Sequence, residues 1–282
     1  MLTKPSVKIR TTSSEMFKNI SETIHVSSIM TPRRNFLCCK PNDLLDKKLS
    51  EMEKGPFDVL PMLVGGDIET GHIAKYLDQE TMKQKRKQGC QYCKDAATEI
   101  EHEDRLQVDF PLEKLIIKFL SRTNKPKIPF FVVNHGNRIV GLMTLADLDK
   151  VAVKTYLFAL ISELELSLLD IISKHYESLK TACKCRYCNG KRKILSADKR
   201  KNPEDRLEDY YYLYLTEMFH MITQSDLNVR IAPHFNTKDY IDIVQLRNTV
   251  AHTKPLVSGK FPVKRLIETQ NLIKSLISAC KS

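Results

Sequence analysis

The chain has 282 residues, with 45 lysines and arginines against 34 aspartates and glutamates, and a net charge of +11. A chain of this length can bury the cores of two ordinary domains, and its 42% hydrophobic and 28% charged residues exclude a disordered or fibrous protein. Nowhere do 18 apolar residues occur in a row and the N-terminus has no apolar signal core, so we expect a cytoplasmic protein with no membrane contact.

Short strands and helices are predicted to alternate through residues 26–150, and the alternation occurs twice. In each half a helix is followed by a strand, a turn with glycine, a second strand and a second helix. The first-half elements are an apolar run at 36–39, a helix at 42–55, a strand at 58–64 and the Gly65-Gly66 turn. The second-half elements are a helix at 111–120, a strand at 128–133, a turn at 135–137 and a strand at 138–144.

Three strings in this region resemble the tandem CBS domain family. They are Ser28-Ile29-Met30-Thr31-Pro32, Leu60-Pro61-Met62 and Gly141-Leu142-Met143-Thr144-Leu145-Ala146-Asp147-Leu148. The resemblance covers roughly Val26 to Lys150 and implies a CBS pair, an α/β sandwich with halves at about 26–80 and 100–150. A basic loop with a C-x-x-C motif separates the halves, and residues 1–25 are interpreted as an N-terminal extension.

The same resemblance implies one adenine-nucleotide site, for AMP, ADP or ATP. It assigns a phosphate contact to Thr144 and both ribose hydroxyls to Asp147, because an ionised carboxylate only accepts hydrogen bonds and a vicinal diol offers two donors. Thr31, in the opening motif, is the third candidate contact. Counted from Gly71, the first half has Ala74 and Leu77 at the matching positions, so one site per chain is expected. The alternative is a dimerisation scaffold that holds no ligand.

From residue 151 to residue 282 the apolar spacing is that of helices. Four amphipathic stripes begin near Leu157, Leu207, Tyr240 and Leu266. Four helices joined by loops predict an all-α bundle, and the whole chain is therefore expected to be an α+β protein of two domains. A basic insert that contains cysteines interrupts the helical domain at 180–203.

The third helix ends with Val244-Gln245-Leu246-Arg247-Asn248-Thr249-Val250-Ala251-His252, which resembles the R-x4-H motif of the HEPN family. In that family the motif belongs to an all-α bundle and frequently makes a metal-independent endoribonuclease. The resemblance implies catalytic roles for Arg247, Asn248 and His252. Asn248 and His252 are four residues apart, so the amide can orient the imidazole on one helix face.

Such a nuclease would use the RNA 2′-hydroxyl to attack the adjacent 3′-phosphate. His252 would act as general base or acid, and Arg247 would stabilise the charge on the phosphorane without a metal ion. A straight helix separates these two side chains by about 140°. Either the helix ends near His252, or a homodimer joins two motifs in one cleft. The alternative is a structural Arg and His in a domain that only binds.

Two C-x-x-C motifs, Cys90–Cys93 and Cys185–Cys188, lie in basic surroundings. Four thiolates could hold a structural zinc ion, and reduced unpaired thiols are the alternative. The adjacent Cys38 and Cys39 are interpreted as core residues. Between Lys180 and Lys201 there are nine lysines and arginines against the single acid Asp198, which indicates a polyanionic partner such as RNA; a solvated loop is the alternative.

Together these patterns predict an adenine-nucleotide-regulated endoribonuclease that acts as a homodimer, with a role in defence or as a toxin by fold-level analogy. The alternative is a nucleotide-sensing protein without catalytic activity, whose helical domain binds RNA or a protein partner.

Overall fold

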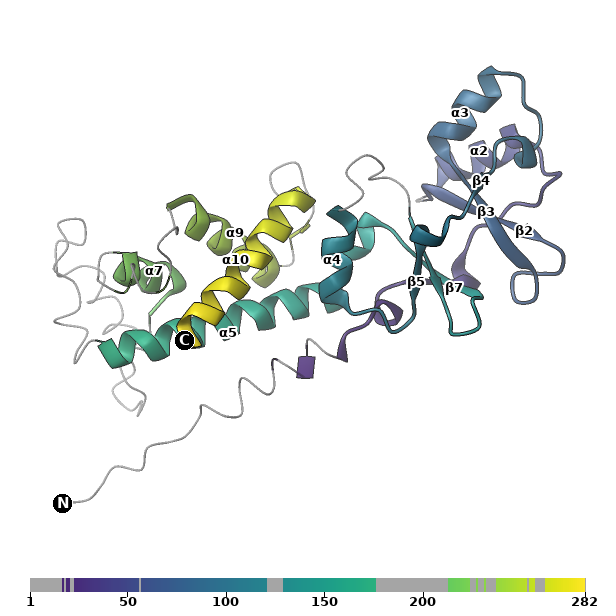
Figure 1. Cartoon of the computed structure of the whole chain (residues 1–282). Helices are drawn as coiled ribbons and strands as arrows, with labels where there is room; N and C mark the ends of the chain where they lie inside the picture. The colour runs from purple at the N-terminus through teal and green to yellow at the C-terminus, as the bar shows by residue number, and fades with distance from the viewer. Residues whose placement is uncertain are drawn as a thin grey trace, which may run out of the picture. The chain divides into compact units, whose positions relative to one another are not determined.

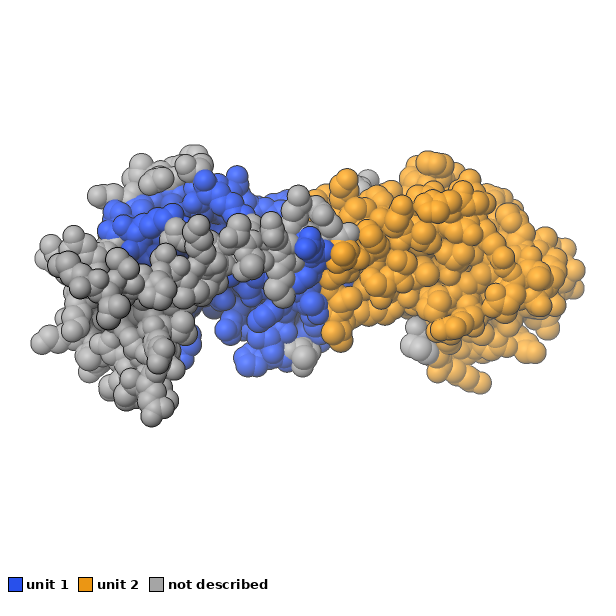
Figure 2. Space-filling model, turned by 90° about the horizontal axis from the view of Figure 1, so that it is seen from below, with its two compact units in different colours: residues 1–22, 153–282 blue, residues 23–152 orange. Residues whose placement is uncertain are grey.

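The computed structural model describes residues 17, 19–20, 23–55, 57–120, 129–175, 213–223, 227, 231, 237–252, 254–256 and 262–281. The chain divides into two compact units (Figure 2). Unit 1 comprises Met1–Glu22 and Val153–Ser282, and unit 2 comprises Thr23–Ala152. The described part of unit 2 is mixed α/β, whereas the described part of unit 1 is helical.

Two sheets form the framework of unit 2 (Figure 1). The first has the order β1-β7-β6-β5, with β1 at Thr31–Pro32, β5 at Arg105–Gln107, β6 at Phe130–Val133 and β7 at Ile139–Met143. The second has the order β2-β3-β4, with β2 at Val59–Val64, β3 at His72–Asp78 and β4 at Thr98–Glu99. The helices are α2 at Leu45–Lys54, α3 at Gln79–Lys87 and α4 at Leu112–Leu120. The predicted order of helix, strand and strand is thus present in both halves.

The internal repeat extends to the strand register. β2 and β3 pair antiparallel with an irregularity between Met62 and Leu63, and β6 and β7 pair antiparallel with an irregularity between Val132 and Val133. Each hairpin is then extended by a short strand from the segment that precedes the other half. β1 precedes the first half but pairs with β7, and β4 precedes the second half but pairs with β3. The two halves are therefore built as an interlocked pair.

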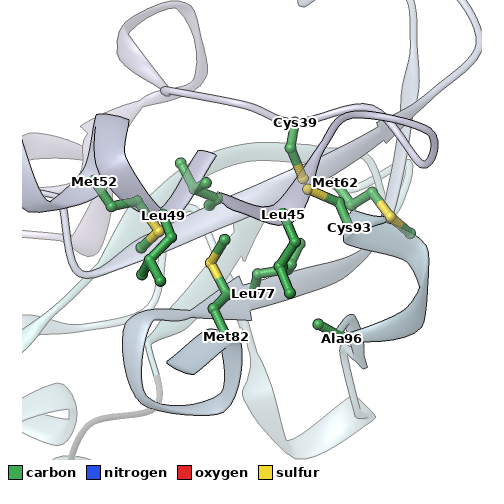
Figure 3. Packing of buried hydrophobic residues seen from close by; sticks show 10 residues of the cluster. Cys39, Leu45, Leu49, Met52, Met62, Leu77, Met82, Cys93 and Ala96 are labelled. Atoms are coloured by element: carbon green, nitrogen blue, oxygen red, sulfur yellow. The ribbon is translucent and has the colours of Figure 1, made fainter. Parts of the chain in front are cut away.

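Apolar side chains on both sides of the strands explain this layered arrangement. Every residue of β6 is buried, which is the pattern of a strand covered on both faces. On α2 the buried residues Leu45, Leu49 and Met52 recur at helical spacing and face β2 and α3 in one core cluster (Figure 3). The predicted apolar run at 36–39 contributes only an isolated bridge, between Cys39 and Met62.

A buried arginine stabilises the region between the two hairpins. Arg33 is 6% exposed and its guanidinium donates to the carbonyl oxygens of Ile68 at 2.5 Å, of Ile139 at 2.9 Å and of Gly71. Ile68 and Gly71 lie between β2 and β3, whereas Ile139 begins β7. Because a guanidinium offers five donors in a planar fork, one side chain satisfies acceptors from both halves.

Unit 1 contains α5 at Val151–His175, α7 at Leu215–Thr223, α9 at Thr237–Ala251 and α10 at Val263–Lys281 among its described residues. α9 packs against α7 and α10. Two polar contacts join α5 and α10: Gln270 on α10 donates to the Tyr156 hydroxyl on α5 at 3.2 Å, and Lys281 on α10 pairs with Glu163 on α5 at 2.6 Å. The predicted helical character is confirmed for these segments, and the predicted insert at 180–203 lies outside the described residues.

None of the described helices combines the length and the apolar character that a bilayer-spanning helix needs.

Candidate functional site

The first candidate site follows β7, where the chain turns at Thr144–Asp147. Asp147 is 5% exposed, and its Oδ2 accepts from the Thr144 backbone N–H at 2.7 Å and from Thr144 Oγ1 at 3.2 Å. The Thr144 side chain in turn accepts from the Asp147 backbone N–H, which completes a capping box for the short 3₁₀ helix Leu145–Asp149. The motif singled out in the sequence is therefore a closed polar turn, and we refer to it as the Thr144–Asp147 box.

A third side chain completes this turn. Lys150 Nζ lies 2.6 Å from Asp147 Oδ1 and also donates to the carbonyl oxygen of Ile29 at 2.5 Å. The lysine side chain is 41% exposed, whereas the aspartate side chain is 7% exposed. Lys150 thus neutralises a buried carboxylate and links it to the segment before β1. Nothing in the sequence pattern marked this residue, although its place three residues after Asp147 allowed the pairing.

The N-terminal strand brings the remaining nucleotide candidate to the same edge of the sheet. Thr31 pairs with Leu142 on β7, two residues before Thr144. The approach of the two segments is close, because a Cβ added at Gly141 would lie 2.2 Å from the Met30 Sδ. The structure therefore gathers Thr31, Thr144 and Asp147 on adjacent segments, and glycine at position 141 allows it.

The first half has a related turn after β3. Lys75, opposite Met62, occupies the register position that Gly141 holds opposite Val132. Asp78 and Thr81 are then the counterparts of Thr144 and Asp147, which corrects the sequence-based alignment with Ala74 and Leu77. That alignment was wrong because the β2–β3 loop is longer than the β6–β7 loop, so Gly71 and Gly141 are not equivalent.

The counterpart turn has the same two residue types in reversed order. The Asp78 carboxylate accepts from the Thr81 backbone N–H at 2.9 Å and from Thr81 Oγ1 at 2.7 Å, and it caps α3. The acidic side chain therefore stands at the first position of the turn in one half and at the last position in the other. The first half therefore still departs from the Thr-x-x-Asp pattern of the second half, as expected, but at Asp78 and Thr81 rather than at Ala74 and Leu77.

The second candidate site lies on α9 in unit 1. Arg247 lines a cavity of about 380 Å³ whose other walls come from α5, α7 and the segment before α7. Its Nε lies 3.8 Å from Glu165 Oε1 on α5. Burial raises the pKa of Glu165, and the nearby guanidinium partly offsets that effect. The rest of the lining is mostly apolar, with Leu166, Leu169, Leu213, Leu215, Met218 and Val244.

The other two residues of the α9 motif point elsewhere. Asn248 and His252 are exposed, and the His252 backbone N–H donates to the Asn248 carbonyl oxygen at 3.1 Å in the last turn of the helix. α9 ends at Ala251, as expected near His252. Arg247 lines the cavity and His252 does not, so one chain does not join the two side chains in that cavity. The angular separation along a straight helix is the reason.

The cysteines behave differently from the predicted zinc ligands. Cys93 is completely buried and belongs to the same core cluster as Cys39. Cys90 is partly buried against the same cluster. Within the described ranges, no three His, Cys, Asp or Glu side chains are grouped so that they could hold a metal ion. Cys185 and Cys188 lie outside those ranges.

Several solved structures are similar to part of this chain. They include CBSX2 in complex with AMP, with 18% identity over 46% of this chain and 97% of that chain and a TM-score of 0.38. A CBS-domain pair with bound AMP from Klebsiella pneumoniae matches with 21% identity over 44% of this chain and 94% of that chain, with a TM-score of 0.35. A CBS domain protein from Shewanella oneidensis MR-1 matches with 20% identity over 44% of this chain and 92% of that chain, with a TM-score of 0.35.

No protein-family model matches the sequence, and no curated protein matches it.

Proposed function

We propose that unit 2 is a CBS-type sensor that binds one adenine nucleotide beside β1 and β7. The observation that carries this proposal is the Thr144–Asp147 box, whose residues resemble the family's ribose and phosphate contacts and which lies next to Thr31. The turn places a carboxylate and a hydroxyl side by side at the end of a buried strand. These are the groups that a ribose diol and a phosphate require.

We infer that binding changes the hydrogen bonds of Asp147 at Oδ1. The two carboxylate oxygens accept from Thr144 on Oδ2 and from Lys150 on Oδ1. Ribose hydroxyls can replace the Lys150 ammonium on Oδ1, because they also donate. Nucleotide binding is thus an exchange of one donor for another on a buried acceptor, and it leaves no buried charge without a partner.

Calorimetric titration of the full chain with AMP, ADP and ATP tests the proposal, with Asp147→Ala beside the wild type. Asp78→Ala is the matched control, because it removes a capping carboxylate from the corresponding turn of the first half. We expect Asp147→Ala to lose binding and Asp78→Ala to retain it. Wild type that binds none of the three nucleotides, or equal loss in both variants, contradicts a single site at Asp147.

We further propose that unit 1 cleaves RNA at the α9 motif, without a catalytic metal. The specific support is the exposure of Asn248 and His252 at the end of α9, where a polymeric substrate can reach them. The imidazole would take the proton of the 2′-hydroxyl, whose oxygen forms a bond to phosphorus while the bond to the 5′-oxygen breaks. The Arg247 side chain of the same helix points in a different direction from His252. The arginine at the cleavage site would therefore come from a second copy of the chain in a homodimer.

Incubation of the full chain with labelled RNA in EDTA, with and without nucleotide, tests this second proposal. We expect wild type to leave 2′,3′-cyclic phosphate ends, and His252→Ala and Arg247→Ala to leave the RNA intact. His220→Ala is a suitable control, since His220 lies on α7 and is not part of the motif. Intact RNA with wild type under every condition contradicts the nuclease and leaves a binding protein.

A further inference from the structure

Two thiols meet in the core of the first half of unit 2. Cys39 is 1% exposed and Cys93 is completely buried, and both belong to one apolar cluster with Leu45, Met62 and others. Figure 3 shows the two sulfur atoms pointing toward one another. The sequence separates these residues by the whole of α2, β2, β3 and α3.

The backbone holds both cysteines in place. Cys39 donates its N–H to the Pro61 carbonyl oxygen at 3.1 Å, and its own carbonyl oxygen accepts from Leu63 at 2.8 Å. The Cys93 N–H donates to Asp43 at 3.0 Å, and the neighbouring Lys94 N–H donates to Pro41 at 3.0 Å. Cys39 is therefore bonded to β2, and the Cys93 segment is bonded to residues 41–43, just after Cys39, which keeps the two cysteines close together.

The two thiols differ in how readily they lose a proton. Interaction with the Cys39 thiol lowers the pKa of Cys93, whereas the same interaction and burial raise the pKa of Cys39. Because the thiolate is the attacking species, Cys93 attacks first, and Cys39 attacks only once Cys93 is part of a disulfide and the interaction that raises the pKa of Cys39 is gone.

The other cysteine of the C-x-x-C motif is more accessible than Cys93. Cys90 is only partly buried and packs against the same cluster, and its loop begins at Gly89, whose φ of 85° marks a sharp turn after α3. A buried thiol pair can be oxidised through a more accessible cysteine by thiol–disulfide exchange, in which each step transfers the bond to the next sulfur. Cys90 is therefore the candidate entry thiol for Cys93.

We propose that Cys39 and Cys93 form a reversible disulfide, with a low-molecular-weight disulfide as oxidant and Cys90 as the entry thiol. Cys90 first attacks the small disulfide and releases one small thiol. Cys93 then attacks Cys90 and releases the second one, and Cys39 finally attacks Cys93 and returns Cys90 to the thiol form. In total one S–S bond breaks and one forms, two protein thiols are oxidised, and their protons leave on two small thiols.

The new bond would close a ring around the secondary structure of the first half. Such a ring restricts the unfolded chain more than the folded one, so the oxidised protein should melt at a higher temperature. The proposal does not depend on nucleotide or RNA binding.

The test treats the full chain with glutathione buffers of increasing oxidised fraction, followed by acid quenching, alkylation under denaturing conditions and peptide mapping. We expect a Cys39–Cys93 linkage in wild type, together with a rise in Tm of about 5 °C or more that dithiothreitol reverses. Cys90→Ser should form the same linkage several-fold more slowly. Cys280→Ser, in the other unit, should behave as wild type.

Peptide mapping of the wild type tests the disulfide proposal even if a Cys39 or Cys93 variant fails to fold. Full alkylation of Cys39 and Cys93 after the most oxidising buffer overturns the proposal. A Cys90–Cys93 linkage as the end product also overturns it, because Cys39 would then be only a core residue.

Discussion

Lys150 Nζ and Asp147 Oδ1 form an ion pair of 2.6 Å at the only turn in the described chain where a capping box joins a Thr to an Asp. The carboxylate is nearly inaccessible and the ammonium group is partly exposed, so the pair is protected from solvent on one side only. Lys150 is also the last residue before α5 begins at Val151. Asp147, the proposed ribose acceptor, is therefore held by the residue immediately before α5.

Replacement of Lys150 by Met should destabilise the nucleotide-free protein by about 1–2 kcal/mol, because Asp147 loses a charged donor while it keeps the Thr144 N–H. Ribose hydroxyls would supply the missing donor, so AMP should raise the Tm of the variant more than that of wild type. Thermal unfolding with and without AMP measures both effects. Equal AMP shifts in the two proteins would show that Lys150 does not compete with ribose.

Gly141→Ala should weaken the contact between β1 and β7. The new methyl group would lie 2.2 Å from Met30 Sδ and 2.9 Å from its Cγ, so the Met30 side chain must move. We expect a loss of about 1–3 kcal/mol in the free energy of unfolding and weaker nucleotide binding.

Gly136→Ala is the matched control for this change. A Cβ at Gly136 would have its nearest neighbour, Asn134 Oδ1, at the ordinary distance of 3.5 Å. Denaturant unfolding of both variants should therefore separate a steric effect at Gly141 from a general effect of replacing glycine. Similar losses in the two proteins would speak against the tight contact.

Arg33→Met should reduce the free energy of unfolding by about 3 kcal/mol, because the carbonyl oxygens of Ile139 and Gly71, both in buried hydrogen bonds, and the partly buried one of Ile68 lose their charged donor. The neighbouring Arg34 is exposed, so Arg34→Met should change stability by less than about 0.5 kcal/mol. Urea unfolding followed by circular dichroism measures both. A tolerated Arg33→Met would mean that water replaces the guanidinium between the two hairpins.

Glu165 should make stability depend on pH. Burial raises its pKa above the usual value of 4.5, so the folded state binds its proton more tightly than the unfolded state does. Stability should therefore fall as the pH rises from about 4.5 through the folded-state pKa, and stay lower above it. Glu165→Gln should remove this part of the pH dependence and unfold at a higher temperature than wild type at neutral pH.

Arg247→Ala provides the opposite perturbation at the same cavity. Without the guanidinium, the pKa of Glu165 should rise further, and the decline in stability should extend to higher pH. Melting curves between pH 4 and pH 8 compare the three proteins. A Glu165→Gln protein with the same pH profile as wild type would show that the carboxylate is well solvated.

Local patterns predicted much of each unit before any tertiary contact was known. The helix now seen at Leu45–Lys54 and the strand at Val59–Val64 lie within the predicted segments, and so do their counterparts Leu112–Leu120 and Phe130–Val133. Apolar periodicity and a glycine turn are properties of adjacent residues, which explains this success. The apolar run at 36–39, in contrast, forms only the isolated bridge from Cys39 to Met62, because strand pairing depends on a distant partner.

The features of the candidate sites also divide into those set by local sequence and those set by contacts between distant residues. The sequence by itself determined the internal repeat, the helical character of the described later segments and the Thr144–Asp147 box, since each depends on spacing within a few residues. Tertiary structure alone decided that β1 joins the sheet of the other half, that Lys150 bonds Ile29, and that Cys93 meets Cys39. Those contacts connect residues far apart in the chain, and strand register and loop length, which no local pattern encodes, bring them together.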